Sequence, residues 1–253
     1  MLDFLFKSKR RDELRKKPLS EEQRAIVRRN VPHFARLSEP DQRELGGHIQ
    51  VFLAEKSFEG CGGLAMTDEI RLTIAAEACV LLLHRETDYY PGVQSILVYP
   101  SAYVVRNVPR RLGDLVVEAD QVRVGESWVR GAVVLSWDSI RRAAREHDGH
   151  NVVLHEFAHQ LDAEDGAMDG VPDLRERSLY AAWARVLGAE YRELVEQVAA
   201  HAEADIDAYG AENPAEFFAV VTEAFFESGE ELKSRHPELY DVLRGFYRQD
   251  PAH

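Results

Sequence analysis

The feature that most constrains this chain is the stretch Asn151–Asp162, which reads NVVLHEFAHQLD. His155 and His159 lie four residues apart, so in a helix they share one face. The other side chains up to Leu161 are uncharged apart from Glu156, and a helix with apolar flanks on every side is typical of a protein core. Burying two histidines and a glutamate is costly unless a metal or a partner satisfies them. The stretch therefore predicts a buried metal-binding helix, in preference to a surface helix with incidental polar residues.

The spacing of these residues also indicates zinc binding and hydrolytic chemistry. Two imidazoles one helical turn apart can hold one Zn²⁺, and a glutamate beside the first can act as general base toward water at that ion. His155 and His159 are thus candidate metal ligands, and Glu156 is the candidate general base. A catalytic zinc takes three protein ligands and leaves one position for water, so a third ligand must come from elsewhere. A structural zinc site is disfavoured, because such sites usually close with four ligands and favour cysteine.

The third ligand is sought downstream of the second histidine. The pattern His-x-x-Gly-x-x-His is absent, because Asp162 stands where glycine is needed and Asp165 where histidine is needed. Further on, Asn213 followed by proline predicts the start of a helix. Glu216 on that helix is a candidate third ligand, and Glu223, seven residues later, faces the same way. The alternative is that Glu216 closes a capping box with Asn213.

Other features leave two interpretations open. Asp205 or Asp207 is a rival third ligand. Tyr209 could donate its phenol to a developing oxyanion or be a buried structural tyrosine. Asp162 could orient a ligand imidazole or simply end the helix. The run Gly131–Trp137 could be an edge strand that aligns a substrate or an ordinary core strand.

Composition narrows the classes of protein. The chain has 253 residues, 45% hydrophobic and 30% charged, which is enough for a real core. Lys and Arg total 31 against 44 Asp and Glu, and the net charge of -13 disfavours binding to a nucleic-acid duplex. Two cysteines cannot build a disulfide framework. No segment approaches the roughly 20 apolar residues of a membrane span, and the first apolar stretch is too short for a signal peptide, so we expect a cytoplasmic protein.

Hydrophobic periodicity predicts an α+β fold that is mainly helical with a small β-sheet. Ser20 and Gln23 form a capping box before the first apolar helix, and Ser38 and Thr67 are candidate caps of two more. Short β-branched or aromatic runs predict strands, after which helical patterns return. These runs are Ser95–Tyr99, Tyr103–Arg106, Leu115–Glu118 and Ala132–Trp137.

The basic N-terminal segment, residues 1–18, stands outside this pattern. We expect a solvated, frayed tail there, with contact to anionic lipid or a partner as the alternative. Residues 19–253 read as a single metallopeptidase domain, with a possible helical lobe up to about residue 60. The basic residues of the tail are Lys7, Lys9, Arg10, Arg11, Arg15, Lys16 and Lys17.

Several segments together resemble the Mlc titration factor A family of zinc-dependent peptidases. The resemblance extends from about residue 20 to about residue 245 and is far more specific than the zinc motif alone. The family is similar at its metal site to the catalytic domain of anthrax lethal factor, which implies a zincin-like fold. The segments that carry the resemblance are Phe58–Leu64, Asp88–Gly92, Ser95–Pro100, Gly125–Trp128, Val133–Trp137, Asp148–Asp162 and Asn213–Phe218.

The resemblance implies roles for single residues. It implies one Zn²⁺ per chain, held by His155, His159 and Glu216, with Glu156 as general base. It also implies that Tyr209 is a transition-state donor. Family members look like aminopeptidases on small substrates, which implies a peptide substrate for this chain.

A second hypothesis comes from another class of protein. The namesake of the family binds the repressor Mlc and lifts repression of glucose-transport genes. The resemblance therefore also suggests a regulatory protein that sequesters a transcriptional repressor, with catalysis secondary. The complete His-Glu-x-x-His motif favours the enzyme. Neither hypothesis requires direct contact with nucleic acid or a membrane span.

Overall fold

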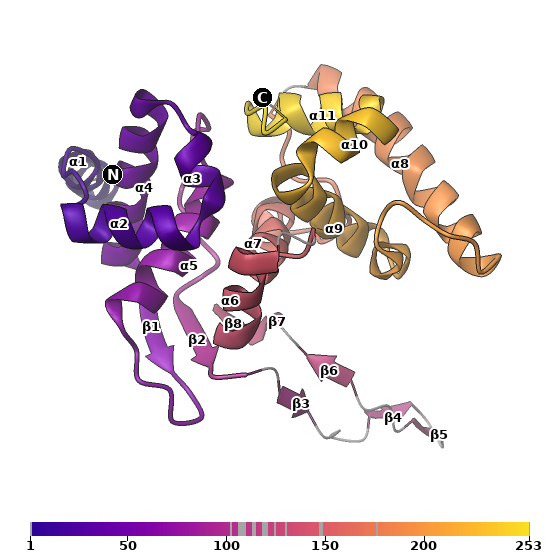
Figure 1. The fold of residues 1–253 in the computed structure, drawn as a ribbon, viewed down its shortest axis with the longest axis horizontal. Coiled ribbons are helices and arrows are strands. Elements are labelled where there is room, and N and C mark those ends of the chain that lie inside the picture. Colours follow the sequence, from indigo (N-terminus) through magenta and orange to yellow (C-terminus); the bar gives the residue numbers. More distant parts are fainter. Residues whose placement is uncertain are drawn as a thin grey trace.

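Helices come first along the chain, as the sequence predicts. The computed structural model describes residues 2–101, 103–105, 110–112, 115–117, 121–123, 125–129, 131–146, 149–175 and 177–252. The N-terminal helices are α1 (Leu2–Arg15), α2 (Glu21–Asn30), α3 (Pro32–Arg36), α4 (Glu39–Glu55) and α5 (Asp68–Val80). They lie together on one side of the molecule (Figure 1).

The predicted helix starts are confirmed by their capping hydrogen bonds. At α2, the Gln23 backbone N–H donates to Ser20 Oγ at 3.2 Å, and the Ser20 backbone N–H donates to Gln23 Oε1 at 3.0 Å. Ser38 caps α4, and Thr67 caps α5. Each cap satisfies a backbone N–H that the helix itself leaves without an acceptor, so these local signals were sufficient to locate the helices.

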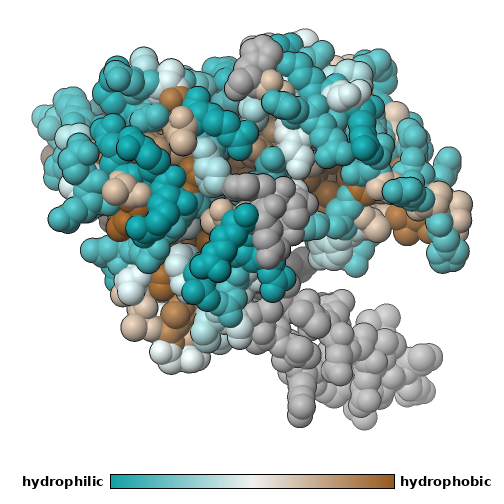
Figure 2. Space-filling view, in the orientation of Figure 1, coloured by the Kyte–Doolittle hydropathy of each residue, from teal (hydrophilic) through white to brown (hydrophobic). Residues whose placement is uncertain are grey.

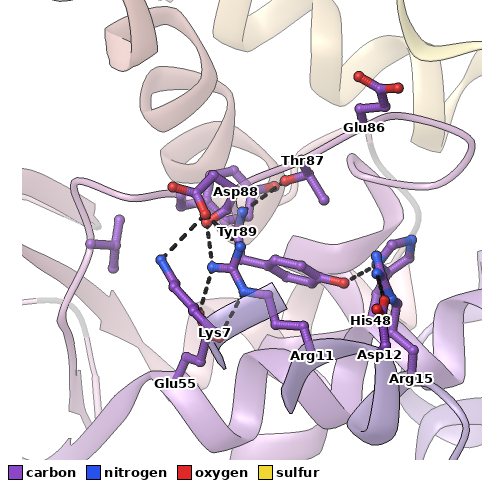
Figure 3. A network of polar contacts seen from close by, with 12 residues as sticks. Lys7, Arg11, Asp12, Arg15, His48, Glu55, Glu86, Thr87, Asp88 and Tyr89 are labelled. Carbon is purple, nitrogen blue, oxygen red and sulfur yellow. Dashed lines mark hydrogen bonds and ion pairs between the residues drawn. The ribbon is translucent and has the colours of Figure 1, made fainter. Parts of the chain in front are cut away.

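The prediction of a frayed N-terminal tail was wrong, because residues 2–15 form α1 and pack against α4. Arg11 is 8% exposed and donates to both carboxylate oxygens of Glu55 at 2.8 Å. It also donates to the Asp88 backbone oxygen at 3.0 Å and to the Asp88 carboxylate (Figure 3). A bidentate guanidinium–carboxylate pair of this kind fixes both distance and orientation.

The backbone of α4 makes room for α1. A Cβ on Gly47 would lie 2.7 Å from the backbone oxygen of Arg15, closer than real Cβ contacts. The absence of a side chain at this position therefore allows the two helices to approach each other. Basic residues near the N-terminus suggested a solvated tail, whereas the docking depends on partners far away in the sequence.

A four-stranded sheet lies next to the N-terminal helices. Its order is β1-β2-β8-β7, with β1, β2 and β8 parallel and β7 antiparallel to β8. The predicted strand at Ser95–Tyr99 is confirmed as β2, and the last predicted strand is confirmed as β8, with its former end, Trp137, starting α6. Strands β1 and β7 were not predicted. The bounds are β1 (Ser57–Gly60), β2 (Ser95–Tyr99), β7 (Gly125–Val129) and β8 (Ala132–Ser136).

The position of β8 decides between two interpretations of that segment. It pairs with β2 on one side and β7 on the other, and all of its residues are buried. The edge-strand interpretation was therefore wrong, and the core-strand alternative holds. The continuous apolar run Ala132–Leu135 fits this position, because a strand buried on both faces needs no polar alternation. The edge next to β8 is β7.

Two antiparallel strand pairs extend from the sheet region, away from the helices (Figure 1). They are formed by β3 (Tyr103–Val105) with β6 (Gln121–Arg123), and by β4 (Arg110–Leu112) with β5 (Leu115–Val117). Strands β3 and β5 confirm two of the predicted runs. The predicted ends of those runs, Arg106 and Glu118, lie outside the described residues.

The remaining helices complete the core around α7, which lies between the N-terminal and C-terminal helices (Figure 1). It packs against α9, α5 and β7. Phe157 on α7 meets Phe52 and Tyr90, with ring centroids 5.6 and 4.7 Å apart. These elements are α6 (Trp137–Glu146), α7 (Val152–Asp162), η1 (Ala163–Asp165), α8 (Arg177–Ala199), η2 (Ala208–Ala211), α9 (Pro214–Glu227), α10 (Gly229–Arg235) and α11 (Pro237–Tyr247).

The face seen in Figure 2 is predominantly hydrophilic, and its apolar residues are exposed in small, separate areas. Most large apolar side chains lie in one cluster that draws residues from α2 through α11. Among the described helices, none is both long enough and apolar enough to span a bilayer.

Candidate metal centre

The helix that carries the two histidines starts at a defined cap. The Asn151 side chain accepts from the backbone N–H groups of Val153 and Leu154, at 3.1 and 3.2 Å. From there α7 runs to Asp162, with Leu154, Phe157 and further apolar residues buried. The predicted buried helix is confirmed. Its burial fixes the helix rotation, so the two histidines point in one direction.

The second helix, α9, starts at Asn213, whose side chain accepts from the Glu216 backbone N–H at 3.0 Å. The Glu216 carboxylate turns toward the histidines of α7. The alternative, in which Glu216 closes a capping box with Asn213, is therefore not what this side chain forms. Phe217 and Phe218 are buried, with their rings against Tyr191 and Trp183, and they anchor the first turn that presents Glu216.

Three possible ligand atoms converge between α7 and α9. Oε2 of Glu216 lies 3.0 Å from His155 Nε2 and 3.2 Å from His159 Nε2. The two Nε2 atoms are 3.2 Å apart. Ligands of a tetrahedral zinc ion at about 2.0–2.1 Å are separated by roughly 3.3 Å, so these distances fit the edges of such a tetrahedron. Two imidazoles and one carboxylate are also the donor set expected of a catalytic zinc site.

The electrostatics of the cluster favour positive charge. Burial alone would lower the pKa of His155, but hydrogen bonds to Glu216 and Glu223 outweigh it and raise the pKa to about 10. For Glu216, burial would raise the pKa, and the hydrogen bonds from His155 and His159 lower it to about 2. The protein therefore gathers carboxylates around its histidines, as a cation-binding site requires.

Glu223 is a site residue whose role was missed at the level of sequence. Its Oε1 lies 2.7 Å from His155 Nδ1, and its other oxygen accepts from the Asn151 backbone N–H. It thus ties the imidazole to the start of the same helix. The only sequence signal was its spacing of seven residues from Glu216, which gave the helix face without the partner.

Glu156 follows His155 on α7, is 5% exposed and interacts electrostatically with His155, His159 and Glu216. Burial raises the pKa of its carboxyl to about 7, with His155 and His159 acting in the opposite direction. A carboxyl whose pKa lies near neutrality can both take up and release a proton, which is what a general base that later acts as an acid must do.

Tyr209 reaches the same place from η2, which packs against α9. Its ring centroid lies 5.9 Å from that of His155, and the residue is 47% exposed. Burial and then the charge of Glu216 raise the pKa of the phenol to about 12, so it keeps its proton at neutral pH. The alternative of a buried structural tyrosine does not hold, because half of the residue faces solvent.

The rival ligands lie elsewhere. Asp207 accepts from the Tyr209 backbone N–H at 2.7 Å and so caps η2, while Asp205 pairs with Arg235. Neither belongs to the group that converges on the two histidines within the described residues. Asp207 thus contributes to the site indirectly, by holding the turn that presents Tyr209.

Asp162 has a different role from orienting a ligand. Its Oδ2 accepts from the Gly170 backbone N–H at 2.9 Å, and neither its Oδ1 nor His159 Nδ1 has a hydrogen-bond partner in the described part of the chain. The carboxylate holds the loop that follows η1 against the start of α9. A Cβ on Gly170 would lie 2.3 Å from the Pro214 backbone oxygen, so this close approach requires glycine.

Comparison with known proteins identifies the family. Residues 5–248 match the family described as Glucose-regulated metallo-peptidase M90. The chain is 47% identical over 244 residues to an uncharacterized protein of Synechocystis sp., a match that covers 96% of this chain and 89% of that protein. It is 33% identical over 225 residues to Mlc titration factor A of Yersinia pestis and of Yersinia pseudotuberculosis, covering 88% of this chain and 83% of each relative.

The chain belongs to this metallo-peptidase family, as the resemblance predicted. The match begins at residue 5 and so includes most of α1, which the sequence-based resemblance left out. Membership supports a hydrolase of the metallopeptidase type that binds a metal ion. His155, His159 and Glu216 are a group able to hold that ion.

Proposed function

We propose that this chain is a zinc-dependent aminopeptidase in which His155, His159 and Glu216 hold one Zn²⁺. The observation that carries the proposal is the convergence of two Nε2 atoms and one carboxylate oxygen, 3.0–3.2 Å apart, between two buried helices. The family supports the metallopeptidase class. The choice of aminopeptidase rests on the resemblance, and the cytoplasmic location rests on the sequence alone.

The protein's own residues supply the proton transfers. Zinc, when bound, polarises the scissile carbonyl and makes water more acidic. Glu156 takes the proton from water and passes it to the leaving amine, a role that its pKa near 7 suits. Tyr209 keeps its phenolic proton and donates a hydrogen bond to the oxyanion that develops on the substrate.

Glu223 and the sheet have positioning roles in this proposal. Glu223 holds His155 through Nδ1 and leaves Nε2 directed at the metal position. Strand β7 forms the edge of the sheet and packs against α7, so an extended peptide could pair with it beside the histidines.

The test measures metal content and hydrolysis on the same preparation. We expect one zinc per chain, turnover of alanyl and other aminoacyl reporters, loss of turnover on chelation, and recovery when zinc is restored. An internally quenched peptide with a blocked N-terminus serves as the control for endopeptidase action. Cleavage of the blocked peptide alone would overturn the aminopeptidase assignment. Failure to bind zinc after repletion would overturn the proposal as a whole.

A second candidate function is sequestration of a transcriptional repressor, and the name Mlc titration factor A of the Yersinia relatives favours it. In that case binding would not depend on catalysis. A pull-down with a purified repressor of the Mlc type should then give equal capture by the wild type and by Glu156→Gln. Absence of capture by both proteins would count against this function.

A further inference from the structure

One face of α1 is exposed to solvent and is mainly basic. Its residues recur at spacings of three and four, so they lie on the same side of the helix. The helix lies at the edge of the molecule, where a large partner can reach it (Figure 1). The outer face of α1, as we name it, consists of Phe6, Lys9, Arg10 and Glu13, with Lys16 and Lys17 in the turn that follows, all of them exposed.

The opposite face of α1 holds the helix in place. Arg11 pairs with Glu55 of α4 and with Asp88, and Leu14 packs against the hydrophobic core. Lys7 Nζ lies 3.3 Å from Asp88 Oδ1 (Figure 3). The outer face is therefore ordered before it meets a partner, and α1 does not have to fold on binding, which would reduce the affinity.

The outer face carries an excess of positive charge. Residues 1–18 contain seven basic side chains and three acidic ones, although the whole chain has a net charge of -13. Lys16 Nζ lies 3.0 Å from Glu13 Oε1. In the described part of the chain, no carboxylate lies within ion-pair distance of Lys9, Arg10 or Lys17. Because charges in water are screened over about 8 Å at physiological ionic strength, this local excess favours an anionic partner.

Phe6 indicates what kind of anionic partner fits. It is 68% exposed, more than any other large apolar side chain in the part of the chain that the structure describes. An aromatic ring beside basic side chains on one face of a helix is typical of helices that lie in a membrane interface. A nucleic-acid duplex offers phosphates without an apolar layer beneath them, whereas a bilayer offers anionic headgroups above acyl chains. The combination of Phe6 with Lys9 and Arg10 therefore favours a lipid surface.

We propose that the outer face of α1 docks on a bilayer that contains anionic phospholipid. Phe6 inserts at the boundary between headgroups and acyl chains, and Lys9, Arg10 and Lys17 contact the headgroups. Each basic residue near an anionic bilayer contributes about a fivefold gain in affinity. The docking is peripheral and reversible, and it is separate from the metal centre on α7 and α9.

The first experiment measures co-sedimentation of the full-length protein with lipid vesicles. One set of vesicles contains phosphatidylcholine alone, and the other contains phosphatidylcholine mixed with phosphatidylglycerol. We expect binding to the mixed vesicles only, and release at high salt, because salt screens the attraction between the basic residues and the headgroups. Binding to neither set, or equal binding to both sets, overturns the proposal.

The second experiment removes the charge of the outer face. Lys9→Gln/Arg10→Gln/Lys17→Gln should lower the affinity for mixed vesicles by about 100-fold, since three factors of about five multiply. The three side chains are exposed and have no ion-pair partner in the described part of the chain, so Tm should not change. A variant that keeps both the wild-type Tm and the wild-type affinity refutes the role of these residues.

The matched control changes the net charge by the same amount elsewhere. Arg177→Gln/Arg185→Gln/Arg192→Gln alters three exposed arginines of α8, on the opposite side of the molecule from α1 (Figure 1). This variant should bind mixed vesicles as the wild type does. Equal losses of affinity in the two triple variants would show that net charge, and not the outer face, decides binding.

The third experiment tests the insertion of Phe6. Phe6→Ala should weaken binding to mixed vesicles by roughly 10-fold, because an apolar ring no longer leaves water. In Phe6→Trp, brominated lipid in the mixed vesicles should quench tryptophan emission beyond the quenching seen in the wild type. Absence of extra quenching, together with equally tight binding of Phe6→Ala to vesicles and to duplex DNA, would assign the outer face to nucleic acid and overturn the proposal.

Discussion

Two groups of histidines and carboxylates in this protein use the same donor atoms in different surroundings. The side chains of His155, His159 and Glu216 are 13%, 7% and 18% exposed, and their donor atoms lie 3.0–3.2 Å apart. In the other group, the side chains of Asp41, Glu44 and His84 are 28–40% exposed, and the two ring nitrogens of His84 face different carboxylates, each at 3.4 Å.

The difference shows what burial adds to a ligand set. The first group is held by two core helices and has the carboxyl of Glu156 and the phenol of Tyr209 nearby, whereas the second has a single buried neighbour, His48. Electrostatic interactions are stronger where water is excluded, and buried ligands lose less freedom on binding. We therefore expect the buried group to bind metal more tightly and to be the group that supports chemistry.

The largest expected effect comes from comparing the loss of one histidine in each group. His159→Ala should lose zinc from the buried group and reduce turnover by on the order of 10³-fold or more, because the metal supplies several kcal/mol. His84→Ala should leave turnover unchanged. Metal analysis and reporter kinetics on both variants give the answer. Equal losses of activity in the two variants would remove the distinction between the groups.

The next effect separates catalysis from metal binding within the buried group. Glu156→Gln removes the general base and keeps the shape of the side chain, so turnover should fall by about 10²–10⁴-fold while zinc content stays the same. Zinc content per chain should be measured beside kcat. A variant with full turnover would contradict the role assigned to Glu156.

A buried histidine outside both groups shows what burial does by itself. His33 is 9% exposed and meets Phe226 edge to face, and burial lowers its pKa to about 4 from 6.5. Between these two pH values the folded state binds fewer protons than the unfolded state. The free energy of unfolding therefore has its full value above pH 6.5 and decreases as pH falls toward 4. The difference between the two pKa values corresponds to about 3 kcal/mol of unfolding free energy.

This pH dependence can be measured by urea unfolding at several pH values between 4 and 7. His33→Gln should flatten the dependence in that window, because it removes the titrating group, and it should also lower stability at pH 7. His201→Gln is the matched control, since His201 is an exposed histidine. An unchanged pH profile in His33→Gln would show that other groups dominate acid destabilisation.

The smallest expected effect comes from Glu223, the carboxylate that orients His155. Glu223→Gln should weaken zinc binding by about 10- to 100-fold, as loss of such oriented partners usually does, and excess zinc should restore most of the turnover. The carboxamide still fills the space, so the fold should persist. Metal affinity by competition with a chelator gives the size of the effect. No change in affinity would mean that helix packing alone orients His155.

Much of the buried group could be predicted because its signals are local. The four-residue spacing of the histidines, the uncharged flanks of α7 and the Asn213 cap of α9 each act within one or two helical turns. Strand β2 was also predicted with its correct bounds, since β-branched and aromatic residues between turn residues are a local signal.

The features that were missed depend on distant partners. Arg11 orders α1 through Glu55 and Asp88, which lie 44 and 77 residues away. Strand β1 was missed because it is defined by its pairing with β2, which its own four residues do not reveal. The role of Glu223 required the distance to His155, which spacing along α9 does not supply.

The sequence alone determined most of the helices, the family and the candidate ligands on α7, because caps, periodicity and residue type act over short stretches of chain. Only the tertiary structure decided which carboxylate meets the histidines and which serves elsewhere. Glu216 and Glu223 approach them, while Asp205 and Asp207 turn to other partners. The physical reason is that ligand geometry depends on how two helices pack, and packing is set by the whole core.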